Sequence, residues 1–141
     1  MNLLVMMAKY PETGRVKTRL GASIGEQEAA NVYAQILRLL IDEHKNQSYE
    51  FIIYASPNAS VMQQWSGILS KSQGKGNHGD RIRKIFREQL SQYDKVVLIG
   101  GDAPEVTHEL VMGAFDQLTN HDIVIGPALD GGYYLIGMKH Y

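Results

Sequence analysis

Short strand-like runs recur along the chain and alternate with segments of helical periodicity. Residues 3–8 are continuously apolar, and further largely apolar runs lie at residues 49–55, 95–99, 122–126 and 133–138. A run that is apolar at every position predicts a strand covered on both faces, as in a parallel sheet. Helices are expected from a cap at Ser23 to about His44, then at 61–69, 82–90 and 108–118, the last capped by Thr107. This alternation predicts an α/β sandwich with a mostly parallel sheet.

Length and composition narrow the class of protein. The 141 residues are 44% hydrophobic and carry a net charge of -1, which suits one domain over residues 1–141. A nearly neutral chain has no overall field that would attract nucleic acid or a membrane surface. The absence of cysteine excludes disulfides and thiolate zinc sites. No segment reaches the roughly 18 apolar residues of a membrane span, so a cytoplasmic protein is expected.

Ligands of open α/β sheets bind outside the carboxyl ends of the strands. This rule draws attention to three loops that follow apolar runs and carry unusual residues. They lie at 9–20, 100–104 and 127–132, whereas the Ser-, Lys- and Gly-rich residues 70–79 are expected to form a plain loop.

The first loop concentrates positive charge around a glycine. Its candidates for binding a nucleotide are Lys9, Gly14, Arg15, Lys17, Thr18 and Arg19. Glycine lets backbone N–H groups approach an anion, and arginine forks can chelate phosphate oxygens. No Walker pattern is present. The loop therefore predicts a phosphate site, the alternative being a solvated basic loop.

The second loop contributes one carboxylate, Asp102, preceded by Gly100 and Gly101. Mg²⁺ prefers oxygen ligands and is often held by one or two carboxylates together with substrate phosphates. The glycines would let a ligand approach the backbone. We expect a Mg²⁺ or Mn²⁺ site at Asp102, the alternative being that this side chain caps a turn before Pro104.

The third loop places Asp130, Gly131 and Gly132 before Tyr133 and Tyr134. An acid followed by two glycines predicts a tight turn, and the tyrosines offer hydroxyls and ring faces. Asp130 is a candidate for holding substrate or orienting a ligand. The alternative is a hairpin-like turn whose tyrosines pack into the core.

Four motifs in this order resemble one family. They are "MAKYPETGRVKTRL", "GNHGDRIRKIF", "IGGDAP" and "IGPALDGGYYLIG". The chain is similar over nearly its whole length to an uncharacterised glycosyltransferase-like family, some members of which are associated with radical-SAM or selenium genes. The family belongs to the nucleotide-diphospho-sugar transferase superfamily, whose more distant members include molybdenum-cofactor and 2-phospholactate guanylyltransferases.

The resemblance implies a three-layer, Rossmann-like fold of the glycosyltransferase-A type, with one antiparallel strand near "DGGYYLIG". It implies that the cations of the first loop hold phosphates and that Asp102 binds the metal. It also implies that residues Gly76 to Arg81 border the base, and that Asp130, Gly131, Gly132 and Tyr133 lie near the acceptor or sugar. Lys17, Asp102 and Asp130 are then the expected catalytic residues.

The chain also departs from the family it resembles. Relatives usually have leucine and glutamate at the positions of His78 and Asp80, and often a small polar residue and cysteine at those of Gly101 and Ala103. They normally continue well beyond the "DGGYYLIG" strand, with a further acidic motif that can complete the metal site. The chain is then a naturally short member, a fragment or a degenerate copy of that family. If the second acidic motif is absent, nucleotide binding is expected to survive while turnover is lost.

Two functional hypotheses remain from sequence. The first is a metal-dependent nucleotidyltransferase or glycosyltransferase that takes a nucleoside triphosphate or a nucleotide-sugar and a small-molecule acceptor. The second is a non-catalytic nucleotide-binding module, with a homodimer covering surface that the short C-terminus exposes. Nucleic-acid binding through the basic residues 81–87 is not expected, because a solvated helix face explains them.

Overall fold

The computed structural model describes residues 1–12, 18–128 and 131–140, with only the backbone described for 18–20. Within these residues, six strands form one sheet in the order β3-β2-β1-β4-β6-β5. The strands are β1 (Asn2–Lys9), β2 (Glu50–Ser56), β3 (Ser70–Ser72), β4 (Lys95–Gly100), β5 (Ile123–Pro127) and β6 (Tyr133–Met138). β6 is antiparallel to both of its neighbours, and the other strands run parallel to one another. The expected mostly parallel sheet with one antiparallel strand is confirmed.

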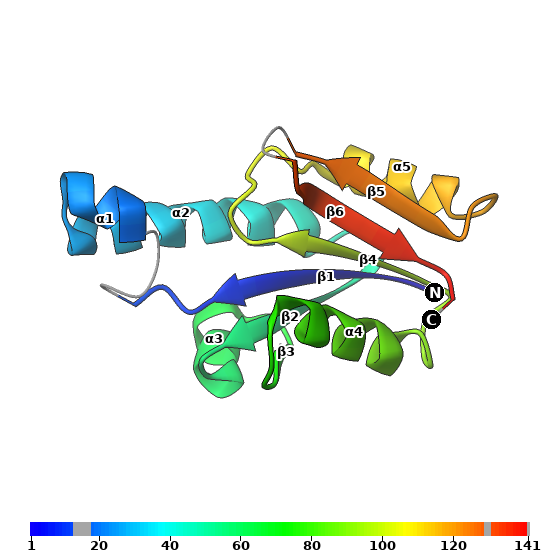
Figure 1. Cartoon of the computed structure of the whole chain (residues 1–141), viewed down its shortest axis with the longest axis horizontal. Coiled ribbons are helices and arrows are strands. Elements are labelled where there is room, and N and C mark those ends of the chain that lie inside the picture. The colour runs from blue at the N-terminus through cyan, green and yellow to red at the C-terminus, as the bar shows by residue number, and fades with distance from the viewer. Residues whose placement is uncertain (13–17, 129–130, 141) are drawn as a thin grey trace.

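Helices cover both faces of the sheet (Figure 1). They are α1 (Thr18–Ile24), α2 (Glu26–His44), α3 (Ala59–Ser66), α4 (His78–Gln89) and α5 (His108–Gln117). Buried side chains of α2, α3 and α5 form one apolar cluster with one face of the sheet. Those of α4 form a second cluster with the opposite face of β1, β2 and β4. The three-layer sandwich predicted from sequence is therefore observed.

Local signals determined where most elements begin. Thr107 caps α5 as predicted, because its side chain accepts a hydrogen bond from the backbone N–H of Leu110. The prediction that Ser23 caps the long helix is wrong, since Ser23 lies inside α1. Gly25 stands at that boundary instead, with a φ of 98° that favours glycine.

The segment 70–79 is not wholly a loop. Its first three residues form β3, which pairs with β2 at the edge of the sheet. Ser-Lys-Ser has no apolar pattern, so sequence periodicity could not reveal this strand. After it, Gly76 takes a φ of 98°, and Asn77 and Asp80 form a capping box that starts α4.

Candidate functional site

The carboxyl ends of the parallel strands meet at one edge of the sheet, which we call the carboxyl edge. β1 ends there at Lys9, β2 at Ser56 and β4 at Gly100, as the parallel registers require. The antiparallel β6 begins at the same edge with Tyr133. All three loops singled out from sequence therefore leave or reach this edge.

Part of the predicted site falls outside the described residues. Gly14, Arg15, Lys17 and Asp130 have no described structure, and Thr18 and Arg19 have only a backbone, at the start of α1. The predicted residues whose side chains are described are Lys9, Arg81, Asp102 and Tyr133, together with Gly76, Gly131 and Gly132. These residues and the side chains that contact them can be placed in the structure.

Tyr33 joins the ends of β1 and β4. It projects from α2, is 7% exposed, and its hydroxyl accepts a hydrogen bond from the backbone N–H of Lys9 at 3.0 Å. Burial raises the pKa of Tyr33, and the nearby charge of Asp102 raises it further, while the bond from Lys9 opposes this. The exposed residues Lys9 and Asp102 are thus both linked to one hydroxyl, Lys9 through its backbone N–H and Asp102 through its charge.

Gly101 has a packing role that the sequence did not indicate. It is buried, and a Cβ there would lie 2.8 Å from Leu37 Cδ2 and 3.1 Å from the Cβ of Ala8. Its backbone N–H donates to the carbonyl of Met7 at 2.9 Å. Glycine therefore lets the loop after β4 cross closely over β1 and α2. That crossing fixes the backbone directly before Asp102 at the end of β1.

Gln73 connects the end of β1 with α4. It is 6% exposed, and its side-chain amide donates to the carbonyls of Ala8 at 3.2 Å and Tyr54 at 3.0 Å. Its side-chain oxygen accepts from Arg81 at 3.0 Å. Arg81 was expected near the base, from the motif resemblance. No role was expected for Gln73, because a lone glutamine in a polar segment does not indicate a functional site.

Arg81 has one atom that its surroundings leave unsatisfied. Its Nε is buried, and no hydrogen-bond partner lies within reach of that nitrogen among the described residues. Buried donors are nearly always paired. Gln73 bonds another nitrogen of the same guanidinium, and the Arg81 side chain as a whole is half-buried. Arg81 is thus held at one nitrogen and unpaired at Nε.

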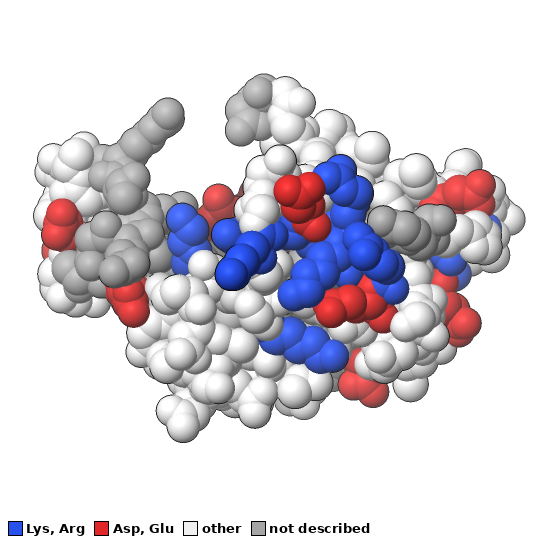
Figure 2. All heavy atoms as spheres, turned by 60° about the horizontal axis from the view of Figure 1, so that its bottom comes forward, with Lys and Arg blue, Asp and Glu red and all other residues white. Residues whose placement is uncertain are grey.

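Positive charge gathers beside this anchor. Six of the 14 Lys and Arg residues lie between 71 and 87, where Asp80 is the only acid. Figure 2 shows Lys and Arg side chains clustered across this face of the molecule. Asp80 pairs with Arg83 and offsets only one of these six charges, so the segment stays positive. An anion near Arg81 would meet a positive potential.

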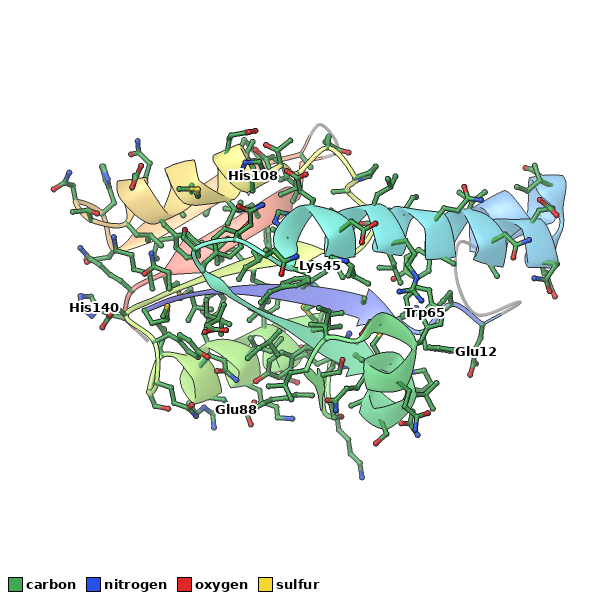
Figure 3. All side chains as sticks on the ribbon, turned by 180° about the vertical axis from the view of Figure 1, so that it is seen from behind. Glu12, Lys45, Trp65, Glu88, His108 and His140 are labelled. Carbon is green, nitrogen blue, oxygen red and sulfur yellow. The ribbon has the colours of Figure 1, made fainter. Side chains whose placement is uncertain are left out.

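Trp65 supports the same edge from α3. Its ring lies edge-on to Tyr10, which directly follows β1, with centroids 6.1 Å apart. The guanidinium of Arg38 lies 3.9 Å from the centre of the ring, and it also donates to the backbone carbonyl of Trp65. Figure 3 shows Trp65 between α3 and α2. The side chain of Trp65 is half-buried and packs against the larger apolar cluster.

The third loop joins β5 to β6 as a hairpin. Gly131 has a φ of 92°, and its N–H donates to the carbonyl of Ala128 at 3.2 Å, while the N–H of Ala128 donates to the carbonyl of Gly132 at 2.9 Å. Tyr134 packs against the core, whereas Tyr133 is 42% exposed. The structural alternative is thus observed for the turn and for Tyr134. The position of Tyr133 at the carboxyl edge leaves its hydroxyl accessible to a ligand.

The contacts of His44 and His108 support the fold. His44 is fully buried, and its two ring nitrogens contact the Tyr49 hydroxyl at 2.6 Å and the Val106 carbonyl at 3.0 Å. His108, labelled in Figure 3, contacts Glu43 at 2.7 Å. Hydrogen bonds from His108 hold the pKa of Glu43 below its usual range. These groups fasten α2 to the start of α5.

Asp102 is the candidate metal ligand whose side chain the structure describes. Among residues 1–12, 18–128 and 131–140, no three His, Asp or Glu side chains lie close enough together to hold a metal ion. Asp102 stands as one exposed carboxylate at the carboxyl edge. That fits a hard cation whose other ligands are phosphate oxygens and water. No helix within the described part of the chain is long and apolar enough to cross a membrane.

The strand order and the single antiparallel strand define a class of fold. It is the architecture of nucleotide-diphospho-sugar transferase and cytidylyltransferase structures. The chain belongs to DUF2064, a family described as uncharacterised proteins conserved in bacteria, whose profile matches residues 30–141. A search of curated proteins found no significant match.

Solved structures agree with this class. A Desulfovibrio desulfuricans G20 protein, described as a "putative nucleotide-diphospho-sugar transferase", is 32% identical with a TM-score of 0.93. The match covers 98% of this chain but 63% of that one, so the chain spans less than two thirds of its length. A cytidylyltransferase from Leptospira borgpetersenii matches at 11% identity and a TM-score of 0.65, covering 98% and 60% of the two chains. A 4-diphosphocytidyl-2C-methyl-D-erythritol synthase from Anaerococcus prevotii matches at 10% and 0.61, covering 98% and 70%. The last two show the fold alone.

Proposed function

We propose that the chain binds a nucleoside triphosphate or a nucleotide-sugar at the carboxyl edge and acts as a metal-dependent nucleotidyl- or glycosyltransferase. We also propose that it belongs to the glycosyltransferase-like group, associated with radical-SAM or selenium genes, that its motifs resemble. One observation supports this above the others. Lys9 ends β1, Asp102 follows β4, and Arg81 is held by Gln73, which also bonds the end of β1, so all three belong to the carboxyl edge of a transferase-type sheet.

The cations would neutralise the phosphates of the nucleotide. Lys9 is exposed at the end of β1, and the chain continues from it into the loop that contains Arg15, Lys17 and Arg19. Transfer from a nucleotide develops negative charge on the departing phosphate groups, and fixed cations lower the barrier by stabilising that charge. Lys17 is the proposed catalytic cation. Gly14 and Thr18 would contribute backbone and hydroxyl donors.

Asp102 would hold a Mg²⁺ or Mn²⁺ ion. When bound, such an ion supplies further charge neutralisation on the phosphate oxygens. Asp102 is a suitable ligand because its carboxylate is exposed while its backbone is fixed by the buried Gly101. Asp130 is the proposed second carboxylate near the acceptor.

Arg81 and the segment from Gly76 would border the base. The contact with Gln73 fixes the guanidinium, so less side-chain entropy is lost when a ligand binds. Gly131, Gly132 and Tyr133 would position the acceptor at the opposite end of the carboxyl edge. An acceptor phosphate is already ionised and could attack without a general base, which favours the nucleotidyl reaction over the glycosyl one.

A non-catalytic nucleotide-binding module is the alternative. One observation favours it: among the described residues, Asp102 belongs to no group of three or more acidic or histidine side chains that could hold a metal ion. A transferase and a binding module both need the contacts to the phosphates and the base, but only the transferase forms a product. Turnover of the bound nucleotide therefore separates them.

A thermal-shift panel of nucleoside triphosphates and nucleotide-sugars, with and without Mg²⁺ or Mn²⁺, tests the proposal. A ligand that binds the native state raises the melting temperature by mass action. We expect one base to give a metal-dependent rise that Arg81→Leu abolishes and Asp102→Asn makes independent of metal. Arg83→Leu is the matched control, since this exposed arginine lies on the same helix and pairs with Asp80. A rise that survives Arg81→Leu unchanged would reject the proposed site.

A further inference from the structure

The loop after β4 holds Asp102 between buried residues. We call residues 101–107 the Asp102 loop. Asp102 is exposed, whereas Gly101 and Ala103 on either side of it, and Val106 further along, are buried. Gly101 is fixed to β1 by a backbone hydrogen bond, and Ala103 and Val106 belong to the larger apolar cluster. The exposed carboxylate therefore belongs to a backbone that is packed before and after it.

A closed turn follows Asp102 directly. The backbone N–H of Val106 donates to the carbonyl of Ala103 at 3.2 Å, which is the bond between the first and fourth residues of a β-turn. Pro104 occupies the second position, where its fixed φ suits such a turn. This bond ties the residue after Asp102 to Val106, so a group that fixes Val106 also fixes the chain beside the carboxylate.

His44 holds the far end of this turn. It lies at the end of α2 with no exposed surface, and its Nε2 lies 3.0 Å from the carbonyl oxygen of Val106. A carbonyl oxygen only accepts, so the proton of the neutral ring lies on Nε2. Nδ1 then accepts from the hydroxyl of Tyr49 at 2.6 Å. Because both ring nitrogens have partners, the ring is fixed in one orientation.

Glu43, the residue before His44, holds the start of α5. Its Oε2 accepts from the backbone N–H of His108 at 2.7 Å and also lies 2.7 Å from Nδ1 of that residue. His108 is the first residue of α5 and directly follows the Asp102 loop. Two consecutive residues of α2 therefore hold the last part of the loop and the helix that follows it.

The same helix also contacts the start of the loop. Tyr33, Leu37 and His44 are buried on α2 and recur at helical spacing. Tyr33 accepts from the N–H of Lys9 at the end of β1. Leu37 packs against Gly101, where a Cβ would lie 2.8 Å from Leu37 Cδ2. One helix face thus sets the distance between the end of β1 and both ends of the Asp102 loop.

We propose that His44 and Glu43 are positioning residues for Asp102, which hold its loop so that the carboxylate is preorganised to bind a metal ion. This inference rests on the Mg²⁺ or Mn²⁺ site of the proposed function. His44 and Glu43 act through the Val106 carbonyl and the N–H of His108, as groups around metal ligands commonly act by orienting the ligand. Without these anchors the loop would have to be ordered when the ion binds, and that loss of entropy would weaken binding.

The affinity of the chain for Mn²⁺ alone, measured by water-proton relaxation without nucleotide, tests the proposal. His44→Phe keeps an aromatic ring but cannot donate to Val106. We expect it to raise the dissociation constant for Mn²⁺ by about 10-fold, the lower end of what groups around metal ligands contribute. His44→Gln should recover most of this loss, because its amide nitrogen can donate to the same carbonyl. A role in stability alone predicts no change in affinity while the chain stays folded.

Glu43 gives a second pair of variants, whose folding is less at risk because its side chain is 34% exposed. Glu43→Leu removes the acceptor for His108 and should weaken Mn²⁺ binding. Glu43→Gln keeps an oxygen that can accept and should weaken it less. Ile85→Val is the matched control for lost stability, because Ile85 is buried on α4, on the opposite face of the sheet. This control should bind Mn²⁺ as the wild type does.

Asp102→Asn distinguishes the positioning role from the metal site itself. If it weakens Mn²⁺ binding while His44→Phe and Glu43→Leu do not, the positioning role is overturned and the metal site stands. If it leaves the wild-type affinity unchanged, the metal site of the proposed function is wrong, and the positioning role falls with it.

Hydrogen exchange of the ion-free chain gives an independent readout. The N–H of Val106 bonds Ala103 and is not the group that His44 or Glu43 binds. His44→Phe and Glu43→Leu should both speed the exchange of this N–H, while the amides of β1 exchange as in the wild type. Unchanged exchange at Val106 in both variants would refute the proposal, even if Mn²⁺ binding weakens.

Discussion

Gln73→Met should weaken the fold and the proposed nucleotide site together. Methionine has nearly the length and volume of glutamine, so the packing around residue 73 changes little. What it removes is the set of hydrogen bonds to Ala8, Tyr54 and Arg81. The two carbonyls belong to neighbouring parallel strands, and Arg81 belongs to α4, so one side chain couples three elements.

The expected loss follows from these contacts. Three hydrogen bonds contribute about 1 kcal/mol each to stability. Burying a thioether in place of an amide recovers about 1 kcal/mol of desolvation cost. The net loss is then about 2 kcal/mol in the free energy of unfolding. Arg81 loses its anchor at the same time, which should weaken nucleotide binding beyond the change in stability.

Urea unfolding followed by the fluorescence of Trp65 measures this loss. Trp65 is the only tryptophan in the sequence, and its contacts with Tyr10 and Arg38 link it to the carboxyl edge and α2. Gln64→Met, at an exposed position of α3, should change the free energy by less than about 0.5 kcal/mol. A Gln73→Met variant as stable as the wild type would refute the reasoning.

Two further predictions concern stability. Gly101→Ala should lower the free energy of unfolding by about 1–3 kcal/mol, because the new methyl group would overpack against Leu37 and Ala8. Gly113→Ala in α5, where a Cβ meets nothing within 4 Å, should instead raise it by up to about 1 kcal/mol. Equal urea midpoints for these two variants would contradict this prediction. Burial lowers the pKa of His44, so the unfolded chain takes up its proton first as the pH falls below about 6.5. Stability should be complete above that pH and then decrease by about 1.4 kcal/mol per pH unit down to the folded pKa. His44→Gln should remove this slope between pH 6.5 and 5 while His121→Gln, at an exposed position, keeps it.

Periodicity and composition predicted most of the fold because the main strands are apolar on both faces. β6 was predicted with the observed bounds, Tyr133–Met138, and its antiparallel direction followed from the motif resemblance. Ser23 was misread as a cap because the capping-box spacing to Glu26 is also compatible with a serine inside a preceding short helix. β3 escaped notice because three polar residues at a sheet edge are held by pairing with β2 alone.

The site was harder to predict than the fold, because its supports depend on tertiary contacts. Lys9 and Asp102 follow strands and could be found by the carboxyl-end rule. Tyr33 and Gln73 could not, since a tyrosine on a helix and a glutamine in a polar segment have many ordinary roles. Gly101 was assigned to a ligand for the same reason: sequence shows that a Cβ is absent but not which atoms would meet it.

The distribution of charge makes a nearly neutral chain suitable for an anionic ligand. Residues 9–19 and 71–87 contain ten of the 14 Lys and Arg residues and only two of the 15 Asp and Glu residues. The first segment starts at the carboxyl end of β1, and the second includes the Gln73–Arg81 contact beside that same end. The rest of the chain is acidic, so its field repels anions from other surfaces. Added salt should therefore slow nucleotide association more than the net charge of -1 would suggest, because the screened field is local.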